Sequence, residues 1–343
     1  MANTISSYFE NAQLSLAAYA ELDLRMNQDK TRYQQALIRA GMSPSQATRF
    51  ADAADGYSIL DQYTDASAGF SATVFQKGTE TFFAIRGTEI GTSFPWITQT
   101  DVGDLLSDAA LALGGVAADQ VVSMYNYYQR LIHSPNEAVP QLTKVVGDSG
   151  THLYLSSVSG IGLGMQAQMT WPLTVTGHSL GGHLGMAFGR IFNSNVSQLY
   201  TYNAPGFNTG AAEVFFNEVN SALGISQPST YLDDSRSTNL YGSGKNIIAG
   251  YATTYGVDTP VFLEANTHSI VALTDSLALY SLFAQLDPAL NTAADGRSQI
   301  TAILQASANI AANSLEATLA AVGKIYGKTY SALAADRNDF YTH

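Results

Sequence analysis

A serine flanked by glycines lies between a β-branched run and an apolar stretch. Residues 173–176 are typical of a buried strand, Gly177-His178-Ser179-Leu180-Gly181 follows directly, and residues 184–188 have helical character. This order predicts a nucleophile elbow, in which a sharp turn strains the backbone of Ser179 and exposes its hydroxyl. Only small residues two positions away on either side tolerate that turn. The alternative, a glycine-rich turn with an incidental serine, is disfavoured by the flanking elements and by a second motif upstream.

A serine hydroxyl at its ordinary pKa is a weak nucleophile and needs a base within hydrogen-bond reach. Only one histidine follows the last predicted strand (residues 259–263) and opens an apolar helix, where the order serine, acid, histidine expects the base. That residue is His268, which we predict to be the base. The six histidines of the sequence are His133, His152, His178, His183, His268 and His343.

The charge that develops on an attacked carbonyl oxygen requires preorganised donors. One predicted donor is the backbone N–H of Leu180, directly after the nucleophile and at a helix N-terminus. The second is the N–H of Thr88, because Arg86-Gly87-Thr88 ends an earlier predicted strand (residues 79–85). An ordinary strand-terminating turn is the alternative for this second segment.

A serine–histidine pair usually works with a carboxylate that orients the histidine, which completes a catalytic triad. This acid should follow the penultimate strand, and the sequence departs from the pattern at this position. A strand at 229–232 would end at Asp234, which we favour, whereas a strand at 237–241 would be followed by no acid. The other candidates are Asp233, Asp258 and Glu264. A separate series, Asp101, Asp104 and Asp108, has the spacing of an acidic helix face rather than a metal site, and the chemistry requires no cofactor.

The segments Phe83–Thr88 and Val175–Gly182, with Trp96 and Asp101, resemble class 3 lipases, and the likeness spans about residues 70–275. The resemblance implies that the Arg-Gly-Thr segment supplies an oxyanion donor. It also implies a lid over about residues 89–100, with apolar residues that contact lipid when it opens.

The predicted N-terminal helices, residues 202–207 and residues 268–277 are closer to the catalytic domains of bacterial RTX-type lipases and phospholipases. Calcium-binding glycine-rich repeats usually follow that domain, and this sequence contains none.

The composition limits the possible partners. The 343 residues are 46% apolar, enough for a sizeable core, and the net charge of −12 argues against nucleic acid and against docking on an anionic membrane. No apolar run approaches the ~18 residues of a transmembrane helix. The N-terminus lacks the pattern of a Sec signal peptide, so we expect either a cytoplasmic protein or one secreted by a type I-like route. There are no cysteines, which excludes disulfides.

Alternating strands and helices predict an α/β-hydrolase fold, with a mostly parallel central sheet and helices on both faces. We expect one domain: a helical N-terminal layer (1–65), the hydrolase core (66–275) and C-terminal helices (276–343). Other predicted elements are a hairpin at 70–85, a helix at 118–134, strands at 198–202 and within 229–242, a helix at 210–223 and helical chain from 268 to about 326. Residues 136–170 are ambiguous, with a possible helix.

These expectations combine into a serine hydrolase that cleaves carboxylic esters of lipids through an acyl-enzyme. Triacylglycerol lipase and phospholipase A1 are not separable from these residues. An acyltransferase or thioesterase would use the same nucleophile, and the unplaced acid keeps a catalytically inactive lipid-binding module as a further alternative.

Overall fold

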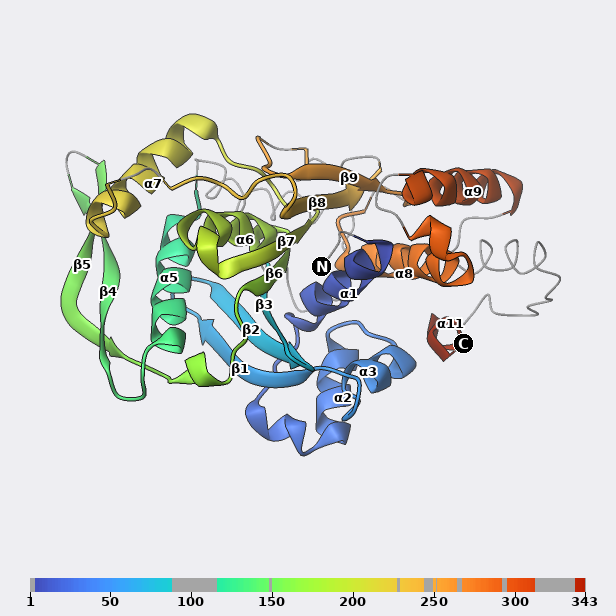
Figure 1. The fold of residues 1–343 in the computed structure, drawn as a ribbon, viewed down its shortest axis with the longest axis horizontal. Helices are drawn as coiled ribbons and strands as arrows, with labels where there is room; N and C mark the ends of the chain where they lie inside the picture. The colour runs from blue at the N-terminus through green and yellow to red at the C-terminus, as the bar shows by residue number, and fades with distance from the viewer. Residues whose placement is uncertain are drawn as a thin grey trace.

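The computed structural model describes residues 4–87, 116–147, 150–226, 229–243, 249–250, 252–263, 267–291, 295–311 and 337–342. Within these ranges a seven-stranded sheet has the order β1-β2-β3-β6-β7-β8-β9 (Figure 1). The first three strands form an antiparallel meander, and β3 is followed in the sheet only by parallel neighbours. The strands are β1 (Ser58–Asp65), β2 (Phe70–Lys77), β3 (Glu80–Ile85), β6 (Leu173–His178), β7 (Val196–Tyr202), β8 (Ser237–Gly242) and β9 (Val257–Val261).

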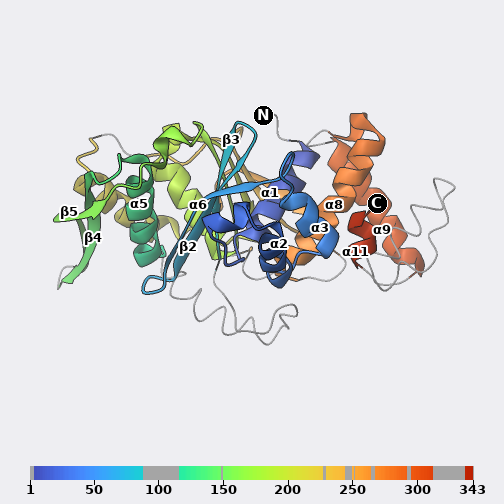
Figure 2. The same cartoon turned by 90° about the horizontal axis from the view of Figure 1, so that it is seen from below.

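Helices cover both faces of this sheet, as Figure 2 shows for β2 and β3. Along β3, Phe82 and Ala84 belong to the apolar core beneath α1 and α8, whereas Phe83 and Ile85 belong to the core beneath α5, α6 and α7. A strand buried on both faces has few polar residues, which explains its continuous apolar run. This mostly parallel sheet confirms the predicted α/β-hydrolase fold. The helices are α1 (Ile5–Ala17), α5 (Ala118–Ile132), α6 (Leu180–Ile191), α7 (Thr209–Ala222) and α8 (Ile270–Leu286).

The N-terminal layer is helical only as far as Phe50. It contains α1, a 3₁₀ turn η1 (Leu24–Asn27), α2 (Lys30–Arg39) and α3 (Pro44–Phe50). The predicted start of α3 is confirmed, because the Ser43 side chain accepts from the N–H of Gln46 in a capping box. The predicted helical boundary at residue 65 is wrong, since Ser58–Asp65 forms β1. This edge strand is only partly buried, so it carries little of the alternation that marks a strand in a sequence.

The ambiguous stretch at 136–170 is mainly a β-hairpin. Strands β4 (Ala138–Gly147) and β5 (Gly150–Ile161) pair antiparallel in a separate two-stranded sheet, and a 3₁₀ turn η2 (Met165–Ala167) follows. The hairpin packs against α5 and α7 at one end of the molecule (Figure 1). The possible helix in this stretch is therefore not formed. Another 3₁₀ turn, η3 (Asn193–Asn195), links α6 to β7.

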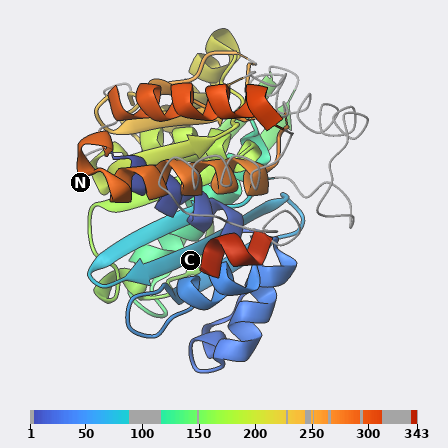
Figure 3. The same cartoon turned by 90° about the vertical axis from the view of Figure 1, so that its right-hand side faces the viewer.

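The C-terminal helices lie on the opposite side from that hairpin. Figure 3 looks onto this side, where α8 and α9 (Asp295–Ala311) lie next to each other and α11 (Arg337–Thr342) lies beside α3. A 3₁₀ turn η4 (Pro288–Leu290) joins α8 to the segment before α9. The predicted helical character after residue 268 is confirmed for α8 and α9, and residues 312–336 lie outside the described residues. None of the described helices is both long and apolar enough to cross a membrane.

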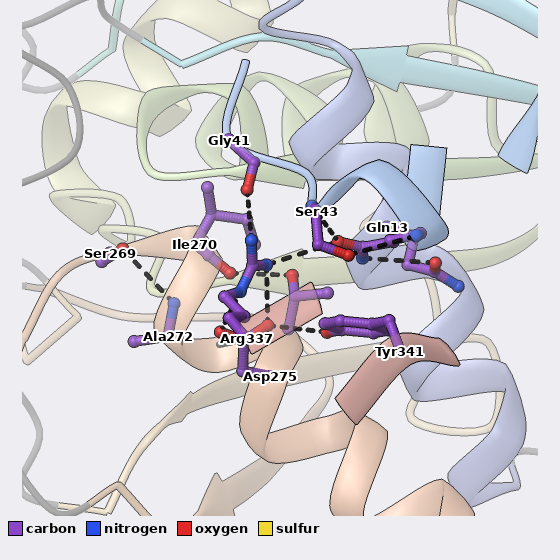
Figure 4. A network of polar contacts seen from close by, with 11 residues as sticks. Gln13, Gly41, Ser43, Ser269, Ile270, Ala272, Asp275, Arg337 and Tyr341 are labelled. Atoms are coloured by element: carbon purple, nitrogen blue, oxygen red, sulfur yellow. Dashed lines mark hydrogen bonds and ion pairs between the residues drawn. The ribbon is translucent and has the colours of Figure 1, made fainter. Parts of the chain in front are cut away.

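A partly buried ion pair fastens α11 to the body of the protein (Figure 4). The guanidinium of Arg337 donates from Nε and Nη2 to both carboxylate oxygens of Asp275 on α8, at 2.6 and 2.7 Å. Its Nη1 donates to the carbonyl of Gly41 at 2.7 Å, and the Tyr341 hydroxyl donates to Asp275 at 2.6 Å. A bidentate arginine–carboxylate pair of this kind combines strength with a fixed orientation.

The substitution Asp275→Asn should lower the free energy of unfolding by about 2 kcal/mol, because it leaves a mostly buried guanidinium without its counter-charge. Urea unfolding followed by circular dichroism measures this loss. The matched control is Asp287→Asn, an exposed cap of η4 at which asparagine is an equally good residue. Equal unfolding midpoints for the two variants would show that the ion pair does not hold α11 in place.

Candidate active site

Ser179 has the strained backbone of a nucleophile elbow. Its φ of 55° and ψ of −129° lie between the end of β6 at His178 and the start of α6 at Leu180. The two motif glycines explain why the turn closes. A Cβ on Gly177 would lie 2.3 Å from the carbonyl oxygen of Gly181, and one on Gly181 would lie 2.2 Å from the carbonyl oxygen of Ile85. The predicted elbow is therefore confirmed as a backbone geometry, and its strain is held by the surrounding strands.

The structure brings His268 to this serine. Nε2 of His268 lies 2.8 Å from Oγ of Ser179, and both side chains are buried. His268 stands one residue before Ser269, whose side chain caps α8 by accepting from the N–H of Ala272. Burial, and secondarily the neighbouring ring of His178, hold the pKa of His268 well below its usual value. The ring is therefore neutral near pH 7, the form in which Nε2 can accept a proton.

The backbone N–H of Leu180, predicted as an oxyanion donor, lies at the start of α6 directly after Ser179. Leu180 is the first residue of α6, and its N–H is among the first-turn groups that a helix leaves without an internal acceptor. The loop after β3 also reaches the elbow: a Cβ on Gly87 would lie 2.5 Å from the carbonyl oxygen of His178 and 3.1 Å from Cβ of Ser179. The next residue, Thr88, lies outside the described residues. So do the predicted lid at 89–100 and the series Asp101, Asp104 and Asp108.

The structure corrects the prediction of Asp234 as the acid of the triad. Residues 229–232 are not a strand, and Asp234 is an exposed residue that precedes β8 instead of following it. Because β8 is parallel to β7, with Ser237 opposite Leu199, its start lies at the far edge of the sheet from Ser179. The two residues are thus separated by the length of the strand.

Asp233, Asp258 and Glu264 are the other carboxylates that the sequence offers as the acid of the triad. Asp233 is an exposed turn residue whose carboxylate accepts from Ser235 and Arg236. Its pKa is lowered mainly by the Ser235 hydroxyl. Asp258 lies near the start of β9, accepts from the Thr254 hydroxyl and is also at the far edge. Glu264 lies outside the described residues.

Two further side chains at the site were not predicted from the sequence. The His178 ring contacts the main-chain carbonyl of His268 through Nε2 at 2.7 Å, and the Tyr19 hydroxyl through Nδ1 at 2.8 Å. Only its position beside the nucleophile singles out His178 in the sequence. Nothing in the sequence singles out Tyr19, which lies 159 residues earlier in the chain than His178.

Metal ions in proteins are commonly held by histidine, cysteine or carboxylate side chains that lie close together. Within the described ranges, no group of three or more histidine, cysteine or carboxylate side chains is placed to hold a metal ion.

No family model and no curated protein matches the sequence. Among solved structures, the Lip2 lipase from Yarrowia lipolytica has a TM-score of 0.35 and 13% identity, covering 78% of this chain and 81% of its own. The lipase from Rhizopus microsporus var. chinensis has a TM-score of 0.32 and 13% identity, covering 74% and 71%. At these values neither likeness bears on what this chain does.

The buried histidines make stability depend on pH. Burial lowers the pKa of both His178 and His183 to about 4, against an ordinary value of 6.5. The unfolded chain therefore binds protons between pH 6.5 and 4 that the folded chain does not. Their contribution to stability is complete above pH 6.5 and falls as the pH drops toward 4. We expect each histidine to add up to about 1.4 kcal/mol per pH unit to this slope.

Urea unfolding at half-unit steps from pH 7 to pH 4 measures that slope. His183→Gln removes one of the titrating groups while keeping a side chain that donates, and it should make the slope shallower. A slope unchanged by this substitution would mean that folding does not lower the pKa of His183.

Proposed function

We propose that this protein is a serine hydrolase that cleaves carboxylic esters of lipids. The observation that carries the proposal is the 2.8 Å contact between Oγ of Ser179 and Nε2 of His268, at a strained elbow between a parallel strand and a helix. A neutral, buried base beside a serine at the end of a strand is the arrangement that acyl transfer requires.

In the proposed mechanism Ser179 attacks the ester carbonyl carbon while its proton passes to Nε2 of His268. The negative charge on the carbonyl oxygen is stabilised by the N–H of Leu180, with the N–H of Thr88 as the second proposed donor. His268 then gives the proton to the leaving alcohol, which leaves an acyl group on Ser179. Water, deprotonated by the same histidine, cleaves the acyl-enzyme and regenerates the serine.

A lipid substrate is proposed from the resemblance to lipases and from the apolar residues within 89–100, among them Phe94, Trp96 and Ile97. The net charge of −12 favours neutral or zwitterionic lipids over anionic surfaces. Triacylglycerol lipase and phospholipase A1 remain the two candidate activities, and the acyl-enzyme is common to both. We propose that the whole chain works as one hydrolase domain.

Replacement of the nucleophile tests the proposal directly. Ser179→Ala should lower the hydrolysis of 4-nitrophenyl butyrate at least about 10³-fold, because it removes the hydroxyl that carries the acyl group in the proposed mechanism. A serine-directed phosphonate should label the wild type at Ser179. The matched control is Ser194→Ala, an exposed serine of η3, which should retain full activity and labelling. Unchanged hydrolysis by Ser179→Ala together with an unlabelled Ser179 would refute the proposed function.

The acyl acceptor and the lipid class are tested with the same enzyme. A series of 4-nitrophenyl esters followed by triacylglycerol and mixed-acyl phosphatidylcholine separates esterase, lipase and phospholipase A1 activities. Faster acyl transfer to an added alcohol than to water would indicate an acyltransferase, and preference for an acyl thioester would indicate a thioesterase. Phosphonate labelling without turnover of any of these substrates would favour the inactive lipid-binding module.

A further inference from the structure

We propose that Tyr19 and His178 are positioning residues that fix the main chain of His268 beside the nucleophile. This inference rests on the proposed function, because it assigns a purpose to the exact placement of the base. Its basis is a hydrogen-bond chain that runs from the end of α1, through the ring next to Ser179, to the carbonyl of the proposed base.

The direction of each hydrogen bond follows from the groups themselves. A carbonyl oxygen only accepts, so Nε2 of His178 must carry the hydrogen in its 2.7 Å contact with the carbonyl of His268. Burial keeps the His178 ring neutral by lowering its pKa to about 4, so Nδ1 then carries a lone pair. The Tyr19 hydroxyl donates to that nitrogen at 2.8 Å. In the other tautomer, two acceptors would face each other across 2.7 Å.

The carbonyl of His268 is also where several elements meet. Asn203, at the end of β7, offers it a longer contact of 3.4 Å from Nδ2, and accepts from the N–H of Gly242 through Oδ1. The His178 contact is the shorter of the two and comes from the strand that carries the nucleophile. His178 therefore ties Ser179 and His268 to the same strand end.

Tyr19 is held in place by the helix before it. Its N–H donates to the carbonyl of Leu16 in the turn that ends α1. Upstream, α1 is bonded to β6: the hydroxyls of Ser15 and Thr176 lie 2.7 Å apart, and Thr176 donates to the carbonyl of Asn11. These bonds hold α1 against β6, the strand that leads to Ser179. They thereby fix the position of the Tyr19 hydroxyl beside His178.

The loop that precedes Thr88 packs onto the same point. A Cβ on Gly87 would lie 2.5 Å from the Tyr19 hydroxyl oxygen as well as 2.5 Å from the carbonyl oxygen of His178. The Tyr19 hydroxyl therefore lies between this loop and the ring of His178. A misplacement of about 1 Å in a reacting group costs roughly 10²-fold in rate, so small shifts here would be visible in catalysis.

The test removes a single oxygen atom. Tyr19→Phe should lower kcat for a soluble 4-nitrophenyl ester by about 10-fold to 100-fold while KM changes less than twofold, because binding does not involve this hydroxyl. The matched control is Tyr33→Phe, which deletes the hydroxyl hydrogen bond of another tyrosine that donates to a main-chain carbonyl, away from the site. It should leave kcat unchanged even if it lowers the melting temperature as much.

Variants of the ring separate positioning from bulk. His178→Gln keeps a donor for the carbonyl and an acceptor for Tyr19, and should retain more kcat than His178→Leu, which has neither. A kcat for Tyr19→Phe within twofold of the wild type, or equal losses in the glutamine and leucine variants, would overturn the inference. If the wild type shows no Ser179-dependent turnover at all, the proposed function has failed instead.

A measurement independent of activity covers variants that do not fold. In ¹⁵N-histidine-labelled wild type, long-range ¹H–¹⁵N spectra at pH 7 should show His178 as the neutral Nε2–H tautomer, assigned by its absence in His178→Gln. The Nδ1–H tautomer, or a charged ring, would overturn the hydrogen-bond chain whether or not any variant is stable.

Discussion

The contact between Ser179 and His268 joins residues 89 positions apart in the chain, and both side chains are buried. A histidine placed in such an interior must be neutral, and burial ensures this by lowering its pKa. The same burial makes each neighbouring polar group require a partner. The elements around the site supply those partners: His178, for example, bonds to the carbonyl of His268 and to the Tyr19 hydroxyl. The same elements keep Ser179 and His268 at hydrogen-bond distance.

The parallel sheet provides the common reference for these groups. The end of β6 carries the nucleophile, the N–H of Ser179 donates to the carbonyl of Tyr202 at the end of β7, and Asn203 follows directly. On one face α6 begins at the serine, and on the other α1 and α8 pack together and bring in Tyr19 and His268. Parallel strands place all their carboxyl ends at one edge, so residues distant in sequence converge there without long loops.

The groups that converge at this edge of the sheet suit the proposed acyl transfer. In the proposed acyl transfer, a neutral histidine, a backbone N–H at a helix start and a strained serine would stabilise the tetrahedral intermediate more than the resting ester. The net charge of −12 and the apolar residues within 89–100 direct the proposal toward neutral or zwitterionic lipid. Arg337 of α11 pairs with Asp275 of α8. The C-terminal helix is therefore fastened to the helix that begins shortly after His268.

The sequence by itself determined the elbow, because its requirements are local: glycines two residues from Ser179, a β-branched run before it and a helix after it. It also predicted the strand and helix order of the core, and His268 from its place after the last strand. Tertiary structure decided where Asp234 lies, since apolar periodicity in 229–242 does not say whether the aspartates begin or end the strand. It alone revealed Tyr19 and His178 as partners, because a hydrogen bond across 159 residues depends on how α1 packs on β6, and that packing leaves no periodic mark in the sequence.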